Sequence, residues 1–196
     1  MTELRLPLFP LNTVLFPGGL LPLRIFEPRY LDMISYCFRH ESNFGVCLIR
    51  EGDEVGKAAF TYNVGTIAKI TDWHRTQEGL LGIWVLGQQR FHILSRTVLP
   101  NQLIEAMIRL IPDEPVQSIP SDYQALVQLL EKIMQQLGAP YEQIPLDFDN
   151  ASWLSQRLAE LLPMPFSQRQ YLLELSDPIQ RLDMITKILQ ALDVNY

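Results

Sequence analysis

Apolar residues dominate the start of the chain, but prolines and glycines divide them into short pieces. Four prolines and the pair Gly18-Gly19 interrupt Leu4–Tyr30 before Pro28 is reached. Proline lacks an amide donor and clashes with the preceding helical turn, so this stretch cannot form a long helix, and it lacks the roughly 20 unbroken apolar residues of a membrane span. The pattern predicts strands at Leu4–Phe9, Val14–Phe16 and Leu20–Phe26 and a turn at Phe16–Gly19.

Proline is tolerated in strands at sheet edges and bulges, so we expect these strands at the rim of a curved sheet. Pro28 suits the first turn of a helix, and Pro28–His40 carries apolar residues at helical spacing. The glycine-containing segment Gly87–Gln89 is interpreted as the turn of a hairpin between two strands. Further apolar runs predict strands at Phe44–Arg50, Ala58–Asp72, Leu80–Leu86, Arg90–Leu99 and Leu103–Leu110.

A helical period begins after the proline-bearing segment 112–120, which we interpret as a linker. Apolar residues from Tyr123 to Leu137 form one stripe, and Gly138 follows as a stop signal. Helix starts are predicted at a capping box Ser121…Gln124, at Asn150 before Ala151–Leu162, at a second box Ser167…Gln170 before Gln168–Leu175, and at Asp177-Pro178.

The order of these elements, strands first and helices second, predicts an α+β fold. Bulged strands with few free edges favour a small closed or half-closed barrel. We therefore predict a β-barrel domain at residues 1–111, the linker at 112–120 and a helical bundle subdomain at 121–196.

Composition and charge limit the class of protein and the kinds of partner that the chain can bind. The 196 residues are 47% hydrophobic and 19% charged, which is typical of a globular chain with a substantial core. A net charge of −6 argues against nucleic acid and against an anionic membrane surface as partners. The N-terminus lacks the pattern of a signal peptide, and two cysteines make no disulfide framework, so we expect a cytoplasmic protein.

Candidate chemistry is sparse. Gly52–Ala58 is one residue short of a phosphate-binding loop and carries two acids, so a surface turn is the better interpretation. Cys37, His40 and Cys47 have partly plausible zinc spacing, but the thiols fall on apolar faces and His40 at a helix end. His74 and His92 lie in segments without a paired nucleophile. We predict no catalytic, cofactor-binding or metal-binding residues.

A binding role is the remaining interpretation. An exposed sheet edge can bind extended polypeptide as an added strand, with pockets for alternate side chains. The candidate apolar patch for such binding comprises Phe16, Leu20, Leu21, Phe26 and Tyr30. The alternative is that these side chains are simply core, because most large apolar residues in a fold of this size are buried.

Three segments also carry a resemblance. The runs PLFPLNTVLFPGGLLPLRIFEPRY, YNVGTIAKI (Tyr62–Ile70) and GIWVLGQQRFHIL (Gly82–Leu94) resemble the N-terminal, substrate-recognising domain of ATP-dependent Lon proteases. Similar domains also occur as free-standing proteins and in cereblon. The C-terminal run LLPMPFSQRQYLLELSDPIQRLDMITKIL resembles the helical segment that follows the barrel in Lon. The resemblance implies a PUA-like pseudo-barrel followed by a helical bundle.

The resemblance also implies that the ATPase and the serine–lysine protease site of Lon lie beyond the matching region. Because the chain ends at Tyr196, we expect a free-standing domain without either activity. Glu27, Arg29 and Arg90 match charged positions of the family. A structural ion pair, such as Glu27 with Arg90, is favoured over a ligand clamp, and breaking a buried pair costs about 3–5 kcal/mol.

The favoured hypothesis is a non-catalytic module that binds unfolded or extended polypeptide, in association with a protease or chaperone component. A small-ligand module is the alternative, and it rests on fold analogy alone. An unrecognised hydrolase ranks third. The sequence identifies no oligomeric state.

Overall fold

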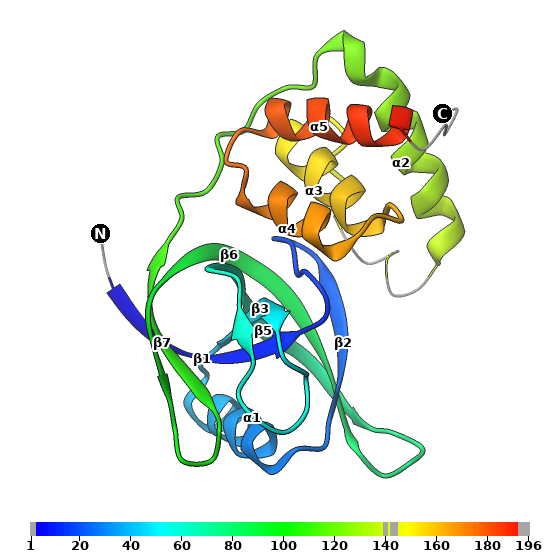
Figure 1. Cartoon of the computed structure of the whole chain (residues 1–196). Helices are drawn as coiled ribbons and strands as arrows, with labels where there is room; N and C mark the ends of the chain where they lie inside the picture. The colour runs from blue at the N-terminus through cyan, green and yellow to red at the C-terminus, as the bar shows by residue number, and fades with distance from the viewer. Residues whose placement is uncertain (1–2, 139–140, 142–144, 192–196) are drawn as a thin grey trace. The chain divides into compact units, whose positions relative to one another are not determined.

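Strands and one helix occupy the first part of the chain and helices the second, so the predicted α+β class is confirmed (Figure 1). The computed structural model describes residues 3–138, 141 and 145–191. Contacts divide the chain into two units, residues 1–113 and 114–196. That residues 112–120 form a linker between two domains stays a prediction.

The first unit is a closed barrel. Each strand of the ring is hydrogen-bonded to the next, and a parallel pairing of the first and third strands completes it. The ring runs β1 (Glu3–Leu11), β7 (Ile104–Leu110), β6 (Leu81–Val98), β5 (Val64–Arg75), β3 (Phe44–Glu51). Two shorter strands lie outside it, β2 (Leu20–Ile25) on β6 and β4 (Phe60–Thr61) on β3. Helix α1 has the predicted bounds, Pro28–His40.

Prolines lie in these strands where one edge is open. Pro7 falls in the half of β1 that pairs only with β7, opposite Glu105. Pro10 falls in the half that pairs only with β3, opposite Cys47. Pro22 lies in β2, whose only strand partner among the described residues is β6. Each of these prolines therefore has one unpaired side, but the expectation that the strands lie at the rim of a sheet holds only for β2, because β1 belongs to the closed ring.

The predicted hairpin at Gly87–Gln89 is wrong, because β6 runs unbroken through it from Leu81 to Val98. The hairpin lies at Thr76–Leu80, where the Thr76 amide donates to the Leu80 carbonyl. Gly87 instead allows a close backbone approach. Its amide donates to the Gly19 carbonyl and its carbonyl accepts from the Gly18 amide, both at 2.8 Å.

Other differences are smaller. The predicted strand at Val14–Phe16 does not form, although the turn at Phe16–Gly19 forms as predicted, with Gly18 at φ 70°. Ala58–Asp72 divides into β4 and β5. Gly65 of β5 lies close to β3, since a side chain there would meet Val46 and Cys47.

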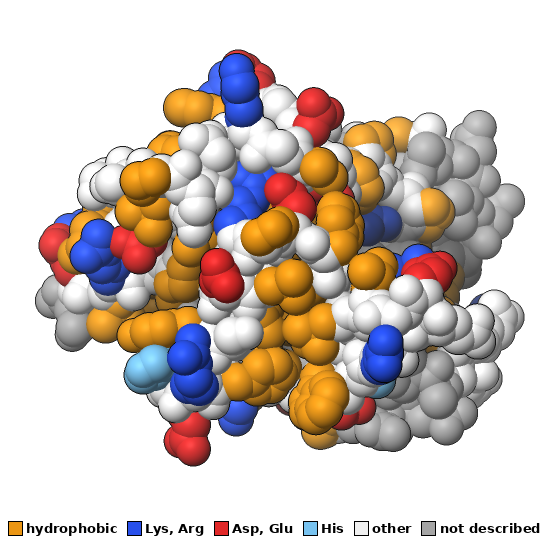
Figure 2. Space-filling view, turned by 90° about the horizontal axis from the view of Figure 1, so that it is seen from below, with side chains coloured by type: hydrophobic (Ala, Val, Ile, Leu, Met, Phe, Trp, Pro, Cys, Tyr) orange, Lys and Arg blue, Asp and Glu red, His pale blue; other side chains and the backbone are white. Residues whose placement is uncertain are grey.

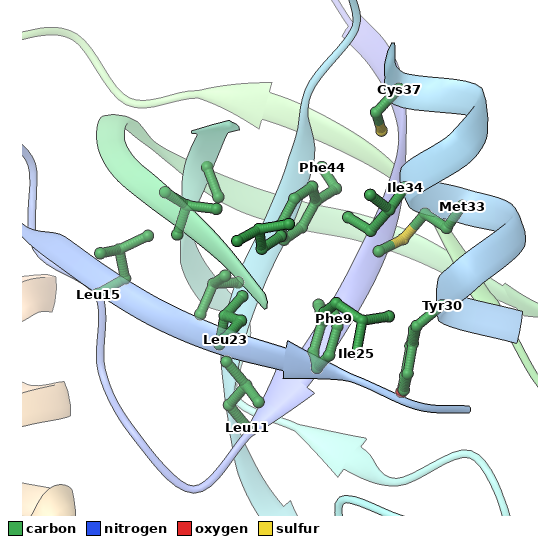
Figure 3. Close-up of a cluster of buried hydrophobic side chains, with 14 of the residues drawn as sticks. Phe9, Leu11, Leu15, Leu23, Ile25, Tyr30, Met33, Ile34, Cys37 and Phe44 are labelled. Carbon is green, nitrogen blue, oxygen red and sulfur yellow. The ribbon is translucent and has the colours of Figure 1, made fainter. Parts of the chain in front are cut away.

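The barrel core has two apolar clusters. The larger one joins β1, β2, β3 and the buried face of α1, and Figure 3 shows Met33, Ile34 and Cys37 of α1 directed toward the strands. The smaller one contains Cys47, Phe91 and Ile108. Both thiols are free and buried, and they lie in different clusters.

The second unit comprises a short 3₁₀ turn and helices. Its elements are η1 (Ser121–Tyr123), α2 (Gln124–Leu137), α3 (Ala151–Leu161), α4 (Phe166–Glu174) and α5 (Pro178–Ala191). None of the helices among the described residues is both long and apolar enough to cross a membrane.

Two predicted helix caps form and two do not. The Asn150 side chain accepts from the Ser152 amide at 3.0 Å, and Asp177 accepts from the Ile179 amide at 2.8 Å. Gly138 follows α2 as predicted. The capping boxes at Ser121 and Ser167 are wrong, because α2 and α4 begin after Tyr123 and Pro165, without a side-chain cap.

Candidate functional site

A groove opens between the end of β1 and the free side of β2. Its volume is about 310 Å³. Phe9 and Leu11 of β1 form one wall, and Leu21 and Leu23 of β2 form the other. The loop between β3 and β4, which we call the acidic loop, borders the groove with Glu54 and Val55. We call it the β1–β2 groove. Its complete lining is Phe9, Leu11, Thr13, Leu21, Pro22, Leu23, Arg24, Phe26, Glu27, Tyr30, Glu54 and Val55.

The groove wall is mainly apolar because of strand alternation. Leu23 and Ile25 are buried, whereas Pro22 and Arg24 are exposed, so one face of β2 points toward the core and the other toward solvent. Figure 3 shows Leu23 of β2 with Leu11 and Phe9 of β1, and Tyr30 beside Phe9. The face of the barrel seen in Figure 2 also shows hydrophobic side chains gathered beside charged ones.

Arg29 ties together the segments that border the groove. Its guanidinium is buried and donates to the Gln102 carbonyl at 2.9 Å and to the Glu54 carbonyl at 3.3 Å. It also forms an ion pair with Glu27 at 3.0 Å. Glu27 in turn accepts from the Gly56 amide at 3.3 Å. One buried cation therefore links α1, the loop after β3 and the loop between β6 and β7.

Tyr30 forms the floor of the groove. Its ring stacks on Phe9 with centroids 4.0 Å apart, and the Arg29 guanidinium lies 4.6 Å from the ring centroid. Burial raises the pKa of the Tyr30 hydroxyl to about 12, against the opposing effect of Arg29. The floor is thus a neutral aromatic surface at physiological pH.

The structure divides the predicted apolar patch. Phe16 and Tyr30 are buried, Leu20 and Leu21 are half-buried, and Phe26 is 52% exposed. Leu21, Phe26 and Tyr30 meet in the groove, whereas Phe16 and Leu20 are not part of its lining. Phe16 belongs to the turn that contacts Gly87.

The predicted charged cluster also divides. Glu27 pairs with its near neighbour Arg29, so the pairing expected with Arg90 is not the one that the structure shows. Arg90 is buried in β6, opposite Thr66 of β5. Glu27 and Arg29 border the groove, and Arg90 is not part of its lining.

Sequence reasoning missed the other half of the site. Val55 is 55% exposed and borders the groove from the acidic loop, which the sequence marked only as a surface turn. Glu54 of the same loop accepts from the Asn12 amide at 2.6 Å and so holds the loop against the end of β1. The signal in the sequence for this part of the groove was a single large apolar residue, Val55, in an acidic turn.

A second hollow of about 470 Å³ lies on the other face of β2. We call it the outer hollow. The His74 ring packs so closely over Gly82 that a side chain at Gly82 would overlap it. Its complete lining is Pro22, Leu23, Arg24, His74, Arg75, Thr76, Gln77, Glu78, Gly82 and Trp84. Pro22, Leu23 and Arg24 border both hollows.

Neither cysteine belongs to the lining of the two hollows. Burial raises the pKa of the Cys47 thiol to about 12 and raises that of Cys37 as well. A catalytic thiol needs the opposite shift, because the thiolate is the nucleophile. His40 is engaged through Nδ1 with the Tyr36 carbonyl, and His92 is exposed on β6.

Comparison with known proteins gives consistent matches. The chain matches the family of the ATP-dependent protease La (LON) substrate-binding domain over residues 5–191. A Lon protease of Anaeromyxobacter dehalogenans is 26% identical over 94% of this chain and 23% of its own length. Lon protease 2 of Herpetosiphon aurantiacus is 28% identical over 98% of this chain and 24% of its own. The chain thus spans about a quarter of the length of these relatives.

Two solved structures share the fold. A Lon N-terminal domain protein from Xanthomonas campestris aligns with a TM-score of 0.80 and 33% identity, covering 94% of this chain and 98% of that one. The N-terminal domain of Mycobacterium avium complex Lon protease aligns with a TM-score of 0.65 and 18% identity, covering 93% and 96%.

Proposed function

Since the chain belongs to the family of substrate-binding domains of ATP-dependent Lon proteases, we propose that it binds extended or unfolded polypeptide in the β1–β2 groove. The observation that carries the proposal is the open apolar rim of this groove. Phe26 and Val55 come from different segments, are more than half exposed, and border one hollow beside a strand with a free side. Exposed apolar clusters of this kind mark interaction sites.

The rim is also held in place before any ligand arrives. Val55 lies between Glu54 and Gly56, whose backbone groups are bound by Arg29 and Glu27. Phe26 lies directly before Glu27 in the chain. A preorganised rim loses little conformational entropy on binding, which favours affinity.

The role proposed is binding without catalysis. The matched region is about a quarter of the two Lon proteases compared, and the buried thiols have pKa shifts opposite to those of a nucleophile. Bound polypeptide would then be passed to a separate protease or chaperone component. Two free buried thiols fit a reducing compartment, so we propose a cytoplasmic location.

A small-ligand module is less well supported. Such sites need a few polar groups that converge on the ligand. In the β1–β2 groove the carboxylates of Glu27 and Glu54 are already engaged by Arg29 and by backbone amides. The groove therefore offers apolar surface more than hydrogen-bonding groups.

The proposal is tested by binding of a fluorescently labelled, permanently unfolded protein to the purified chain. The variant Phe26→Ser/Val55→Ser removes two apolar side chains from the rim, and we expect its affinity to fall at least about tenfold, as for loss of apolar anchors at an interface. Phe60→Ser/Val98→Ser is the matched control, because Phe60 and Val98 are 59% and 52% exposed and lie outside the groove.

Thermal unfolding of both variants establishes that the barrel is intact. Equal loss of affinity in the two variants would mean that unfolded protein binds to any exposed apolar surface of the chain. The groove would then be excluded as the specific site. A chain that binds no unfolded protein would overturn the proposed function itself.

A further inference from the structure

Resting on the proposed function, we infer that the ligand binds by strand addition to the free edge of β2. An extended segment pairs with this edge and places alternate side chains in the β1–β2 groove and beside the exposed side chains of Pro22 and Arg24. The ligand class is therefore an extended peptide that is apolar at every second position.

The backbone of β2 supports this inference. Pro22 has no amide hydrogen, so within an antiparallel pair it belongs at a position whose nitrogen points away from the partner strand. Hydrogen-bonding direction alternates along such a strand. Leu20 and Arg24, two residues to either side of Pro22, therefore direct their amide and carbonyl groups away from β6. No other described strand pairs with that edge.

The β1–β2 groove lies where every second side chain of an added strand would fall. Side chains of a strand project alternately to the two faces of its sheet, in step with the neighbouring strand. Leu21 and Leu23 of β2 line the groove, and the exposed side chains of Pro22 and Arg24 lie on the other face of β2. A peptide beside β2 would thus place alternate side chains in the groove and beside Pro22 and Arg24.

Charge distinguishes the two faces. In the β1–β2 groove the acidic groups are engaged, so a side chain that enters meets Leu21, Phe26 and Val55. On the outer face Arg24 is exposed beside one acid, Glu78, whose carboxylate lies 3.7 Å from the Arg24 guanidinium on the exposed surface. An acidic side chain is favoured there over a basic one. The preferred peptide alternates apolar and acidic residues.

A second copy of this chain is the competing occupant of a free edge. Pairing β2 with β2 of another copy in antiparallel register around Pro22 would place two residues without an amide hydrogen near the centre of the new ladder. A foreign strand that has an amide hydrogen at every residue can therefore form more hydrogen bonds with this edge than a second copy of β2 can.

The test uses a capped peptide as long as β2, six residues, that alternates Val and Glu. Single N-methyl groups are introduced at each position in turn. Strand addition predicts that methylation weakens binding at every second residue, by about two- to tenfold for each lost hydrogen bond, and is tolerated between them. Replacing Glu by Lys should weaken binding, and 0.5 M salt should reduce the difference.

A variant pair tests the protein side. Arg24→Pro and Arg24→Ala both remove the charge, but only proline removes the outward amide, so Arg24→Pro should bind more weakly. Thermal unfolding confirms that both are folded, and Leu20→Pro repeats the test at the other outward position. Uniform methylation effects, equal binding by the two Arg24 variants, or dimerisation through β2 would each overturn strand addition. The groove proposal survives any of these results as long as Phe26→Ser/Val55→Ser still weakens binding of unfolded protein.

Discussion

Gly87 and Phe16 lie so close that a methyl group on Gly87 would overlap the Phe16 carbonyl oxygen. The contact joins the middle of β6 to the turn that precedes β2, and paired hydrogen bonds between Gly87 and Gly18-Gly19 surround it. The position of β2, and with it one wall of the groove, depends on the absence of a side chain at Gly87.

We therefore expect Gly87→Ala to destabilise the barrel by about 1–3 kcal/mol, the usual range for forcing an extra carbon into a packed site. Urea unfolding followed by tryptophan fluorescence measures the loss. Gln88→Ala, at the next position, is the control and should change the free energy of unfolding little. A Gly87→Ala protein as stable as the Gln88 variant would show that the turn can move away freely.

Arg181 and Glu114 form a buried pair in the helical unit. Both side chains are almost fully buried, and the guanidinium donates to the two carboxylate oxygens at 3.0 and 2.5 Å and to the Leu172 carbonyl at 2.9 Å. We expect Arg181→Met to cost about 3–5 kcal/mol, because it leaves a buried carboxylate without its cation.

The exposed pair Arg109–Glu3 is the control for this prediction. Arg109→Met should cost less than about 1 kcal/mol in the same urea experiment, because solvent screens an exposed pair. Similar losses in the two variants would show that burial adds nothing to the Arg181 interaction.

Helix caps allow the sequence signals to be tested, because two of the four predicted side-chain caps form in the structure and two do not. Asn150→Ala and Asp177→Ala remove observed caps, and each should lower the free energy of unfolding by about 1 kcal/mol. Ser121→Ala and Ser167→Ala alter sequence signals that form no cap, so they should have little effect. Thermal unfolding of the four variants decides the question, and a loss at Ser121 or Ser167 equal to that at Asn150 would contradict the cap assignment.

Stability should fall in alkali. The pKa of Tyr30 is raised from 10.0 to about 12, so folding favours its neutral form. That contribution is fully present below pH 10 and is lost as the pH rises from about 10 to about 12, where the unfolded chain releases the proton first. The loss is on the order of 2 kcal/mol. Cys47 contributes in the same direction from about pH 9 to pH 12.

Urea unfolding at about pH 8 and pH 11 measures the effect. Tyr30→Phe keeps the ring stacked on Phe9 and removes the titrating hydroxyl, so its stability should fall less over this interval. If the natural protein and Tyr30→Phe lose the same stability, the Tyr30 hydroxyl is not shielded from solvent in the folded state.

The sequence predicted correctly those elements that are determined by residues within them or directly beside them. The bounds of α1 follow from Pro28 and from the spacing of apolar residues within the helix itself. Caps at Asn150 and Asp177 need only the next few amides. Pro22 indicates that β2 has an open side at that residue, because proline has no amide hydrogen to donate to a neighbouring strand.

Only the tertiary structure decided features that join distant parts of the chain. Glycine at position 87 is compatible with a turn or with a close approach, and the neighbour that selects the approach, Phe16, lies 71 positions earlier in the sequence. The groove likewise brings together Leu11, Phe26 and Val55, which no local pattern relates. Hydrophobic periodicity determined that the strands exist, but which apolar side chains are buried and which border an open groove depends on closure of the barrel by β1 and β3.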